Sequence, residues 1–192
     1  MPAVLVVTGP SGAGKGTLIQ ALVERVPAIE ATVSATTRPR RRGEEDGREY
    51  WFLSDEEFLA RVERGEFLEH VDYVSGRRYG TLRSELDRIA RNGRVPLLEL
   101  ETEGALRVKH DVPGAVTIFV SARVEELERR LRERATESTG EIGERIELAR
   151  QQLEQADEFD YVIENDVLDR AVGELTQLVT GLLSPAATMP RR

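Results

Sequence analysis

Short apolar segments alternate along the chain with segments of helical character. Residues 3–8 form an unbroken apolar run of the kind found in a strand that is buried on both faces. Residues 17–25 then show apolar side chains at helical spacing. Similar apolar runs recur at residues 29–33, 95–100, 116–120 and 161–163. This alternation predicts an α/β fold built on a five-stranded, mainly parallel sheet.

Residues 34–81 interrupt the alternation. They begin with a basic loop and continue with the aromatic run Tyr50-Trp51-Phe52. Ser54-Asp55-Glu56-Glu57 is typical of a capping box that opens a short helix, which Gly65 would end. A hairpin over residues 71–79, turning around Ser75-Gly76, would follow. We therefore predict an inserted lobe over residues 34–81.

Residues 125–155 form the second interruption. They are almost entirely charged and helical, with helix-weakening residues near 136–143. Such a segment could fold over a ligand as a lid. The remaining segments, 1–33, 82–124 and 156–192, would make the core, with a frayed tail from Ser184 onward.

Composition narrows the classes of protein. The chain has 192 residues, 40% hydrophobic and 32% charged, enough to bury one core. It contains no cysteine, which excludes disulfides and thiolate metal sites. No charged leader precedes the first apolar run, and no run approaches the roughly 18 residues that span a bilayer. We therefore expect a cytoplasmic protein that does not bind a membrane. We also expect no binding to nucleic acid, because the net charge of the chain is −8.

A glycine-rich loop follows the first predicted strand and precedes the first predicted helix. It reads Gly9-Pro10-Ser11-Gly12-Ala13-Gly14-Lys15. In this context glycines let backbone N–H groups converge on phosphate oxygens, while the helix dipole and the lysine add positive potential. The general pattern places Ser or Thr after the lysine to bind Mg²⁺, whereas this chain has Gly16 and then Thr17. Either Thr17 supplies the hydroxyl, or Mg²⁺ is held mainly by phosphates and water. A simple strand-capping turn is the alternative.

An arginine-rich loop opens the predicted lobe. It places four arginines within residues 38–42. Guanidinium groups bind phosphate in a bidentate manner, so this loop favours a second phosphate site. A solvated basic loop is the alternative. Together the two loops predict an enzyme that transfers the γ-phosphoryl group of ATP to a phosphorylated acceptor.

These motifs resemble those of guanylate kinase, a P-loop family that converts GMP and ATP to GDP and ADP. The resemblance covers about residues 3–183, and the glycine after Lys15 is itself similar to the form found in this family. The matching stretches are the phosphate loop, Ser34 with Thr36-Thr37-Arg38, Arg41 with Gly43-Glu44, Gly47 with Tyr50, Phe67-Leu68-Glu69, Tyr79-Gly80-Thr81, Arg134 with Thr136-Glu137 and Arg145, and Tyr161-Val162-Ile163 with Asn165-Asp166.

The resemblance implies roles for particular residues. Arg38, Arg41, Tyr50 and Tyr79 would hold the GMP phosphate, and Ser34, Glu69, Gly80 and Thr81 would lie at the guanine. Residues 9–17, Asn165 and Asp166 would bind ATP, with Mg²⁺ as cofactor and Thr17 as its candidate ligand. Lys15, Arg38, Arg134 and Arg145 would act in catalysis. Assembly into a homo-oligomer is left open.

The chain departs from this family at several positions. Glu99 and Glu101 stand where the family has aspartates, and Glu103 stands where it has glutamine. Each glutamate moves its carboxylate by about 1.5 Å. We expect one of Glu99 and Glu101 to face the waters of Mg²⁺ and the other to face the acceptor nucleoside, with chance surface acids as the alternative. Ala135 replaces a glycine in the lid, which would stiffen its hinge.

Two other functions fit parts of the sequence. A ribose bisphosphate kinase shares the phosphate loop and lid, but Glu69 and residues 37–50 suit a nucleotide acceptor better. A non-catalytic guanylate-kinase-like module that binds protein partners typically loses the loop lysine or the lid arginines. This chain keeps Lys15, Arg134 and Arg145.

Overall fold

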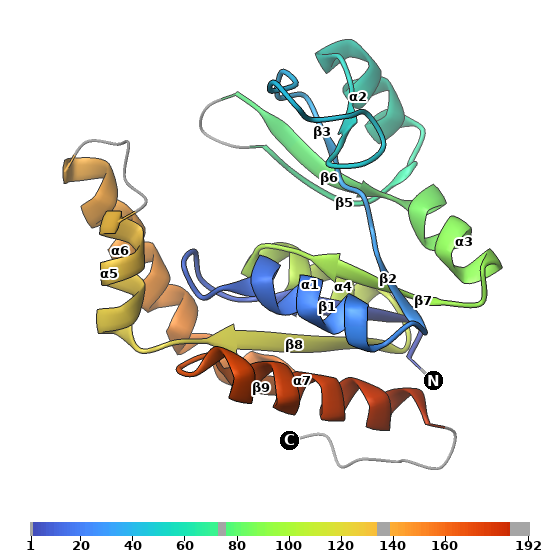
Figure 1. Cartoon of the computed structure of the whole chain (residues 1–192). Coiled ribbons are helices and arrows are strands. Elements are labelled where there is room, and N and C mark those ends of the chain that lie inside the picture. The colour runs from blue at the N-terminus through green and yellow to red at the C-terminus, as the bar shows by residue number, and fades with distance from the viewer. Residues whose placement is uncertain (1, 73–75, 134–138, 185–192) are drawn as a thin grey trace.

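A five-stranded parallel sheet forms the centre of the chain. The computed structural model describes residues 2–72, 76–133 and 139–184 (Figure 1). The sheet consists of β1 (Val4–Thr8), β2 (Ile29–Ala31), β7 (Val95–Glu99), β8 (Ala115–Ser121) and β9 (Tyr161–Glu164). The strand order is β2-β7-β1-β8-β9, and each neighbouring pair is parallel. The predicted α/β fold is confirmed.

Helices cover both faces of this sheet. Leu5 and Val7 of β1 pack in a cluster with α1 (Lys15–Arg25) and α7 (Leu168–Leu183). Val4 and Val6 point to the opposite face and pack with α4 (Thr102–Asp111). Because β1 is buried on both faces, its sequence is continuously apolar rather than alternating.

A second sheet belongs to the predicted lobe. It contains β3 (Ala35–Thr36), β4 (Trp51–Phe52), β5 (Phe67–Asp72) and β6 (Arg78–Leu82), in the order β4-β3-β6-β5. Helix α2 (Asp55–Glu63) packs on it through Phe58, and Trp51 packs at the edge of the same small core. Ser54 caps α2 by accepting a hydrogen bond from the backbone of Glu57 at 3.1 Å, as predicted. The two strands of the predicted hairpin reach from Phe67 to Leu82 and so extend beyond residues 71–79, whereas residues 73–75, with Ser75 of the predicted turn, lie outside the described residues.

Two helices lie in the segment predicted to be a lid. They are α5 (Val124–Glu133) and α6 (Thr139–Glu154), which pack against each other beside the main sheet (Figure 1). The short helix η1 (Ala156–Glu158) then leads to β9. Arg134 and Ala135 lie outside the described residues. Within the described part of the chain, no helix combines the length and apolar character needed to cross a membrane.

The chain crosses between the two sheets at two places. Residues 32–34 lead from β2 to β3, and α3 (Arg83–Arg91) leads from β6 to β7. Glu85 of α3 joins the two crossings, because its buried carboxylate accepts a hydrogen bond from the backbone of Val33 at 3.0 Å. The division into core, lobe and lid at the boundaries given above stays a prediction.

Candidate active site

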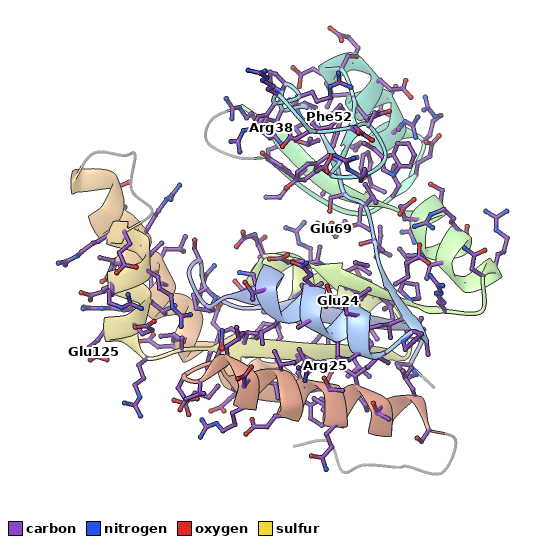
Figure 2. All side chains as sticks on the ribbon, viewed as in Figure 1. Glu24, Arg25, Arg38, Phe52, Glu69 and Glu125 are labelled. Carbon is purple, nitrogen blue, oxygen red and sulfur yellow. The ribbon has the colours of Figure 1, made fainter. Side chains whose placement is uncertain are left out.

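One cleft of about 750 Å³ lies between the main sheet and the lobe. The predicted site residues that line it are Ser11, Gly12, Gly14, Lys15, Gly16, Thr17, Ser34, Tyr50, Glu69, Tyr79, Gly80, Glu99 and Glu101. Figure 2 shows Glu69 on the side of the lobe that faces the core, with Arg38 and Phe52 farther into the lobe. The fold therefore brings the glycine loop and the lobe together across one space.

The glycine loop needs glycine where it passes close to neighbouring strands. Gly9 has a φ of 136°, and a Cβ there would lie 2.2 Å from the backbone oxygen of Val120. Gly14 has a φ of 88°, and a Cβ there would lie 2.5 Å from Nδ2 of Asn165. Both conformations and both approaches exclude larger residues. The result is a bare backbone at the start of α1.

The start of α1 presents positive potential to the cleft. Gly14 caps this helix without a side-chain hydrogen bond, and the first turn of α1 carries no acidic residue. Backbone N–H groups at such a helix start bind anions. Lys15 lines the same space, and its Nζ donates to the backbone oxygens of Gly9 at 2.7 Å and Pro10 at 3.2 Å. The ammonium group thus rests on carbonyl groups of its own loop.

Two residues from distant parts of the chain hold this loop in place. Nδ2 of Asn165 donates to the backbone oxygen of Ala13 at 2.7 Å. Nη1 of Arg130 donates to the backbone oxygen of Gly12 at 3.1 Å, while its Nε bonds Glu126. No sequence motif marks Arg130, because it is one of many arginines on a charged helix. Asn165 does not line the cleft, and its buried Oδ1 has no hydrogen-bond partner in the described residues.

On the opposite wall, Glu69 is a half-buried carboxylate that points toward α4. Its Oε1 accepts a hydrogen bond from the hydroxyl of Thr81 at 2.8 Å, across the β5–β6 pair. A Cβ at Gly104 would lie 3.4 Å from its Oε2, so this glycine leaves room at the carboxylate. Burial raises the pKa of Glu69 above its ordinary value, although the Thr81 hydrogen bonds oppose the shift. Such a carboxylate is suited to a ligand that offers hydrogen-bond donors.

Arg38 is held inside the lobe rather than exposed in the cleft. Its Nη1 and Nη2 donate to the two carboxylate oxygens of Glu44 at 3.1 and 2.8 Å. Its guanidinium lies 5.3 Å from the ring centre of Tyr50 and 5.6 Å from that of Phe52. The Glu44 pair raises the pKa of Arg38. Arg41 is exposed, and its backbone N–H donates to the same carboxylate at 2.7 Å.

Two tyrosines connect Arg38 with the cleft. The rings of Tyr50 and Tyr79 meet edge to face with centres 5.9 Å apart, and both line the cleft. Burial raises the pKa of Tyr50, so its hydroxyl stays protonated and able to donate a hydrogen bond.

Glu99 and Glu101 stand at the carboxyl end of the central strand β7, where ligands bind in open α/β sheets. Glu99 ends the strand and Glu101 caps α4, and both line the cleft with Lys15 and Thr17. Burial by the surrounding protein raises the pKa of Glu99. The positive charge of Lys15 opposes this shift, and the negative charge of Glu101 adds to it. Carboxylate and hydroxyl oxygens are the donors that Mg²⁺ prefers, so this set fits a Mg²⁺ site.

Several predicted site residues lie away from the cleft. Arg38, Arg41, Thr81, Asn165, Asp166 and Arg145 do not line it, and Arg134 lies outside the described residues. Asp166 bonds the backbone of Val167 and the side chain of Arg170. The structure adds lining residues that sequence reasoning missed, namely Thr32, Glu49, Val71, Arg77, Leu100 and Gly104. In the sequence, the one feature that could have marked these residues is that they stand close to residues of the motifs.

Comparison with known proteins agrees with this geometry. The family model described as guanylate kinase matches residues 1–181. A guanylate kinase from Synechococcus sp. (strain JA-3-3Ab) is 47% identical over 176 residues, which cover 91% of this chain and 81% of that protein. A guanylate kinase from Rubrobacter xylanophilus is 43% identical, covering 94% of both chains.

Solved structures show the same likeness. The crystal structure of guanylate kinase from Anaplasma phagocytophilum is 28% identical with a TM-score of 0.73, covering 95% of this chain and 87% of that one. The structure of TT1252 from Thermus thermophilus, 19% identical with a TM-score of 0.52, shares the fold and covers 96% of this chain and 99% of that one. Because the family model spans nearly the whole chain and the relatives match over most of their length, this protein belongs to the guanylate kinase family.

Proposed function

We propose that the protein transfers the γ-phosphoryl group of ATP to GMP, giving ADP and GDP. One observation carries this proposal: a single cleft has the glycine loop with Lys15 on one wall and Glu69 on the other. The first wall is suited to a polyphosphate and the second to a purine with hydrogen-bond donors. The net charge of −8 also favours a small metabolite over a nucleic acid as partner. The cytoplasmic location stays a prediction.

Glu69 would select guanine. Its carboxylate can accept hydrogen bonds from N1–H and the 2-amino group together, whereas adenine presents an acceptor at N1 and lacks the amine. The Thr81 hydroxyl fixes Oε1 at 2.8 Å and thus sets the direction of the carboxylate. Ser34 and Gly80 line the same part of the cleft. A purine without these donors would leave the half-buried carboxylate unpaired, which commonly costs about 10⁴-fold in selectivity.

The acceptor phosphate would lie at Tyr50, Tyr79, Arg38 and Arg41. Both tyrosines line the cleft, and the guanidinium of Arg38 lies 5.3 Å from the ring centre of Tyr50. Arg41 is exposed on the same loop and can swing toward an anion. These four groups would orient the nucleophilic phosphate oxygen, which needs no general base because it is already an anion.

The donor would lie on the glycine loop. Lys15 would leave the Gly9 and Pro10 carbonyls and bridge the β- and γ-phosphates, while backbone N–H groups within the loop at residues 11–17 bind their oxygens. Asn165 holds the loop and, with Asp166, would border the adenine. Thr17 would hold Mg²⁺, one of Glu99 and Glu101 would face its waters, and the other would face the acceptor nucleoside; when bound, this ion neutralises charge that develops on the phosphates.

The lid would complete the site. Arg145 is exposed on α6, and Arg134 follows α5 directly. Both would reach the transferred group when the lid closes and would stabilise its charge as arginine fingers do. Closure also excludes water, so ATP hydrolysis without acceptor should be slow.

A coupled assay of ADP release tests the proposal directly. GMP, dGMP, AMP, UMP, CMP and ribose 1,5-bisphosphate would each be offered with ATP and Mg²⁺. We expect GMP to give the highest kcat/KM and AMP a value lower by orders of magnitude. Preference for ribose 1,5-bisphosphate would replace this proposal with the sugar-phosphate kinase, and no transfer to any acceptor would favour the non-catalytic module.

A further inference from the structure

Arg77 lines the cleft directly before β6, the strand that pairs with β3. In the antiparallel pair of β3 and β6, Ala35 lies opposite Gly80 and Thr36 opposite Tyr79. The backbone N–H of Thr37 then donates to the Arg78 oxygen at 3.0 Å. Extended one step beyond these paired residues, the same register would bring Arg38 opposite Arg77. Residues paired in this way project from the same face of a sheet.

The two arginines that precede Tyr79 face opposite sides. Arg78 points away from the cleft, where it pairs with Asp55 and Asp72. Arg77 and Tyr79 both line the cleft, as expected from alternation along a strand. Among the described residues, no hydrogen bond or ion pair engages the exposed guanidinium of Arg77. It is thus a cation directed at the cleft, with donors available for a ligand.

The acceptor phosphate has less positive charge at hand than the arginine-rich loop suggests. GMP carries close to two negative charges on its phosphate at pH 7, since the second pKa of a phosphate monoester is about 6. Both carboxylate oxygens of Glu44 pair with Arg38, so this pair contributes no net charge. Another donor of Arg38 goes to the Pro39 carbonyl. Of the two arginines assigned to the acceptor phosphate, Arg41 would then be the one with a charge unpaired among the described residues, which neutralises half of the dianion.

We propose that Arg77 is a further phosphate-binding residue for the acceptor nucleotide. This inference rests on the proposed function and adds a residue to the same site. Cleft-lining positions on the hairpin run from Glu69 to Val71 and its partner Tyr79 and then to Arg77. Steps of two residues along a strand span about 6.6 Å. A guanine at Glu69 therefore places its 5′-phosphate between Tyr79 and Arg77.

The test compares GMP with guanosine, which lacks the phosphate. Calorimetric Kd values for both ligands would be measured on the wild type and on Arg77→Gln. We expect about a tenfold weaker Kd for GMP and an unchanged Kd for guanosine, because only the charged hydrogen bond is lost. In steady-state assays KM for GMP should rise by a similar factor, with KM for ATP and kcat little changed.

Further variants distinguish a direct contact between Arg77 and the GMP phosphate from a long-range effect of the positive charge. Arg77→Lys should recover part of the affinity for GMP, since it restores the charge without the planar fork. Arg91→Gln is the matched control, because this exposed α3 arginine bonds, among the described residues, only the backbone oxygen of Asp87 in its own helix. At 1 M salt, charges separated by more than about 3 Å are screened from each other. The loss of GMP affinity in Arg77→Gln should persist under this condition, because it comes from a direct contact.

The results that would overturn the inference are distinct. Equal Kd values for GMP on wild type and Arg77→Gln would remove Arg77 from the acceptor site. Equal weakening for guanosine would indicate a disturbed lobe, and a change in KM for ATP alone would place Arg77 at the donor. Failure of the wild type to bind GMP or transfer phosphate would instead refute the proposed function.

Discussion

At the scale of single residues, Glu69 has the clearest consequence for specificity. Replacing it by glutamine keeps the size and the Thr81 contact but removes the second acceptor. We expect Glu69→Gln to lower the ratio of kcat/KM for GMP over AMP by about 10- to 100-fold. The coupled assay measures this ratio. Glu63→Gln, at an exposed position of α2 in the same lobe, serves as control. An unchanged ratio would contradict the assignment of Glu69 to guanine.

The pKa of Glu69 adds a pH dependence. Guanine binds the carboxylate, and burial raises the pKa of this group above 4.5. Affinity for GMP should therefore fall as the pH drops through that raised value, at a higher pH than an ordinary glutamate would show. Titration of the GMP phosphate affects the wild type and Glu69→Gln alike. The wild-type to variant ratio of KM should consequently approach one in acid, and a constant ratio would argue against this titration.

The two lysines provide a second contrast between residues. Lys15 lies on the phosphate loop. In contrast, Nζ of Lys109 donates to the backbone oxygen of Glu158 at 2.7 Å and lies 3.2 Å from the carboxylate of the buried Asp160. We expect Lys15→Met to abolish turnover with an unchanged circular dichroism spectrum, because the charge on the phosphates is no longer met. Lys109→Met should keep turnover and lose about 1 kcal/mol of stability. More than about a tenth of wild-type activity in Lys15→Met would disprove the loop assignment.

Sequence reasoning at this scale identified residues that stand within motifs. Lys15, Tyr50, Glu69 and Tyr79 were predicted for the site, and the structure places all four around one cleft. Their roles stay predictions. Arg130 was missed because it approaches the loop through tertiary packing from a segment far along the chain, and Gly104 was missed because only its contact with Glu69 across the fold marks it. The pairing of Arg38 with Glu44 was also unforeseen, since composition shows charges but not which of them neutralise each other.

At the scale of elements, an ion-pair network joins the two crossings between lobe and core. Glu85 of α3 binds the backbone of Val33 and the guanidinium of Arg88, which in turn pairs with Glu30 of β2. Arg94 pairs with the other oxygen of Glu30 at 2.9 Å. The network ties α3 to the edge strand of the core and to the start of the lobe. It thereby limits how the lobe pivots.

Glu85→Gln tests the contribution of this network. Burial alone would raise the pKa of Glu85, but the bonds from Arg88 and Val33 lower it below 4.5. A lowered pKa gives stability that is present above pH 4.5 and lost as the pH falls through the folded value. We expect the variant to lose about 2 kcal/mol of unfolding free energy at pH 7, and less below pH 4.5. Asp87→Asn, exposed on the same helix, should change little in the same urea titrations. Equal stability of Glu85→Gln and wild type would show that the network is dispensable.

The elements of the core were predictable and those of the lobe only in part. Each core strand is a buried apolar run, so hydrophobicity alone marks it. In the lobe, β3 and β4 have two residues each, too short for a periodic signal. Their parallel pairing and the order β4-β3-β6-β5 depend on contacts between segments that no local pattern specifies.

At the scale of the whole molecule, the cleft couples binding with stability. A ligand that contacts both walls stabilises the folded chain by about 2.7 kcal/mol at 100 times its Kd. For a chain of this size we expect GMP to raise Tm by about 5 to 10 °C at that concentration. Scanning fluorimetry measures the shift, with AMP as control. A shift that survives Glu69→Gln would show that GMP binds elsewhere.

The position of Trp51 makes the lobe optically distinct from the core. It is the one tryptophan of the chain, and its ring packs where a Cβ at Gly47 would come within 2.8 Å. Emission near 350 nm would therefore report the hydration of the lobe without any label, while far-ultraviolet dichroism is dominated by the helices around the main sheet. Coincident melting curves from the two signals would mean that lobe and core unfold as one cooperative unit. Separated curves would reveal a lobe that opens before the sheet is lost.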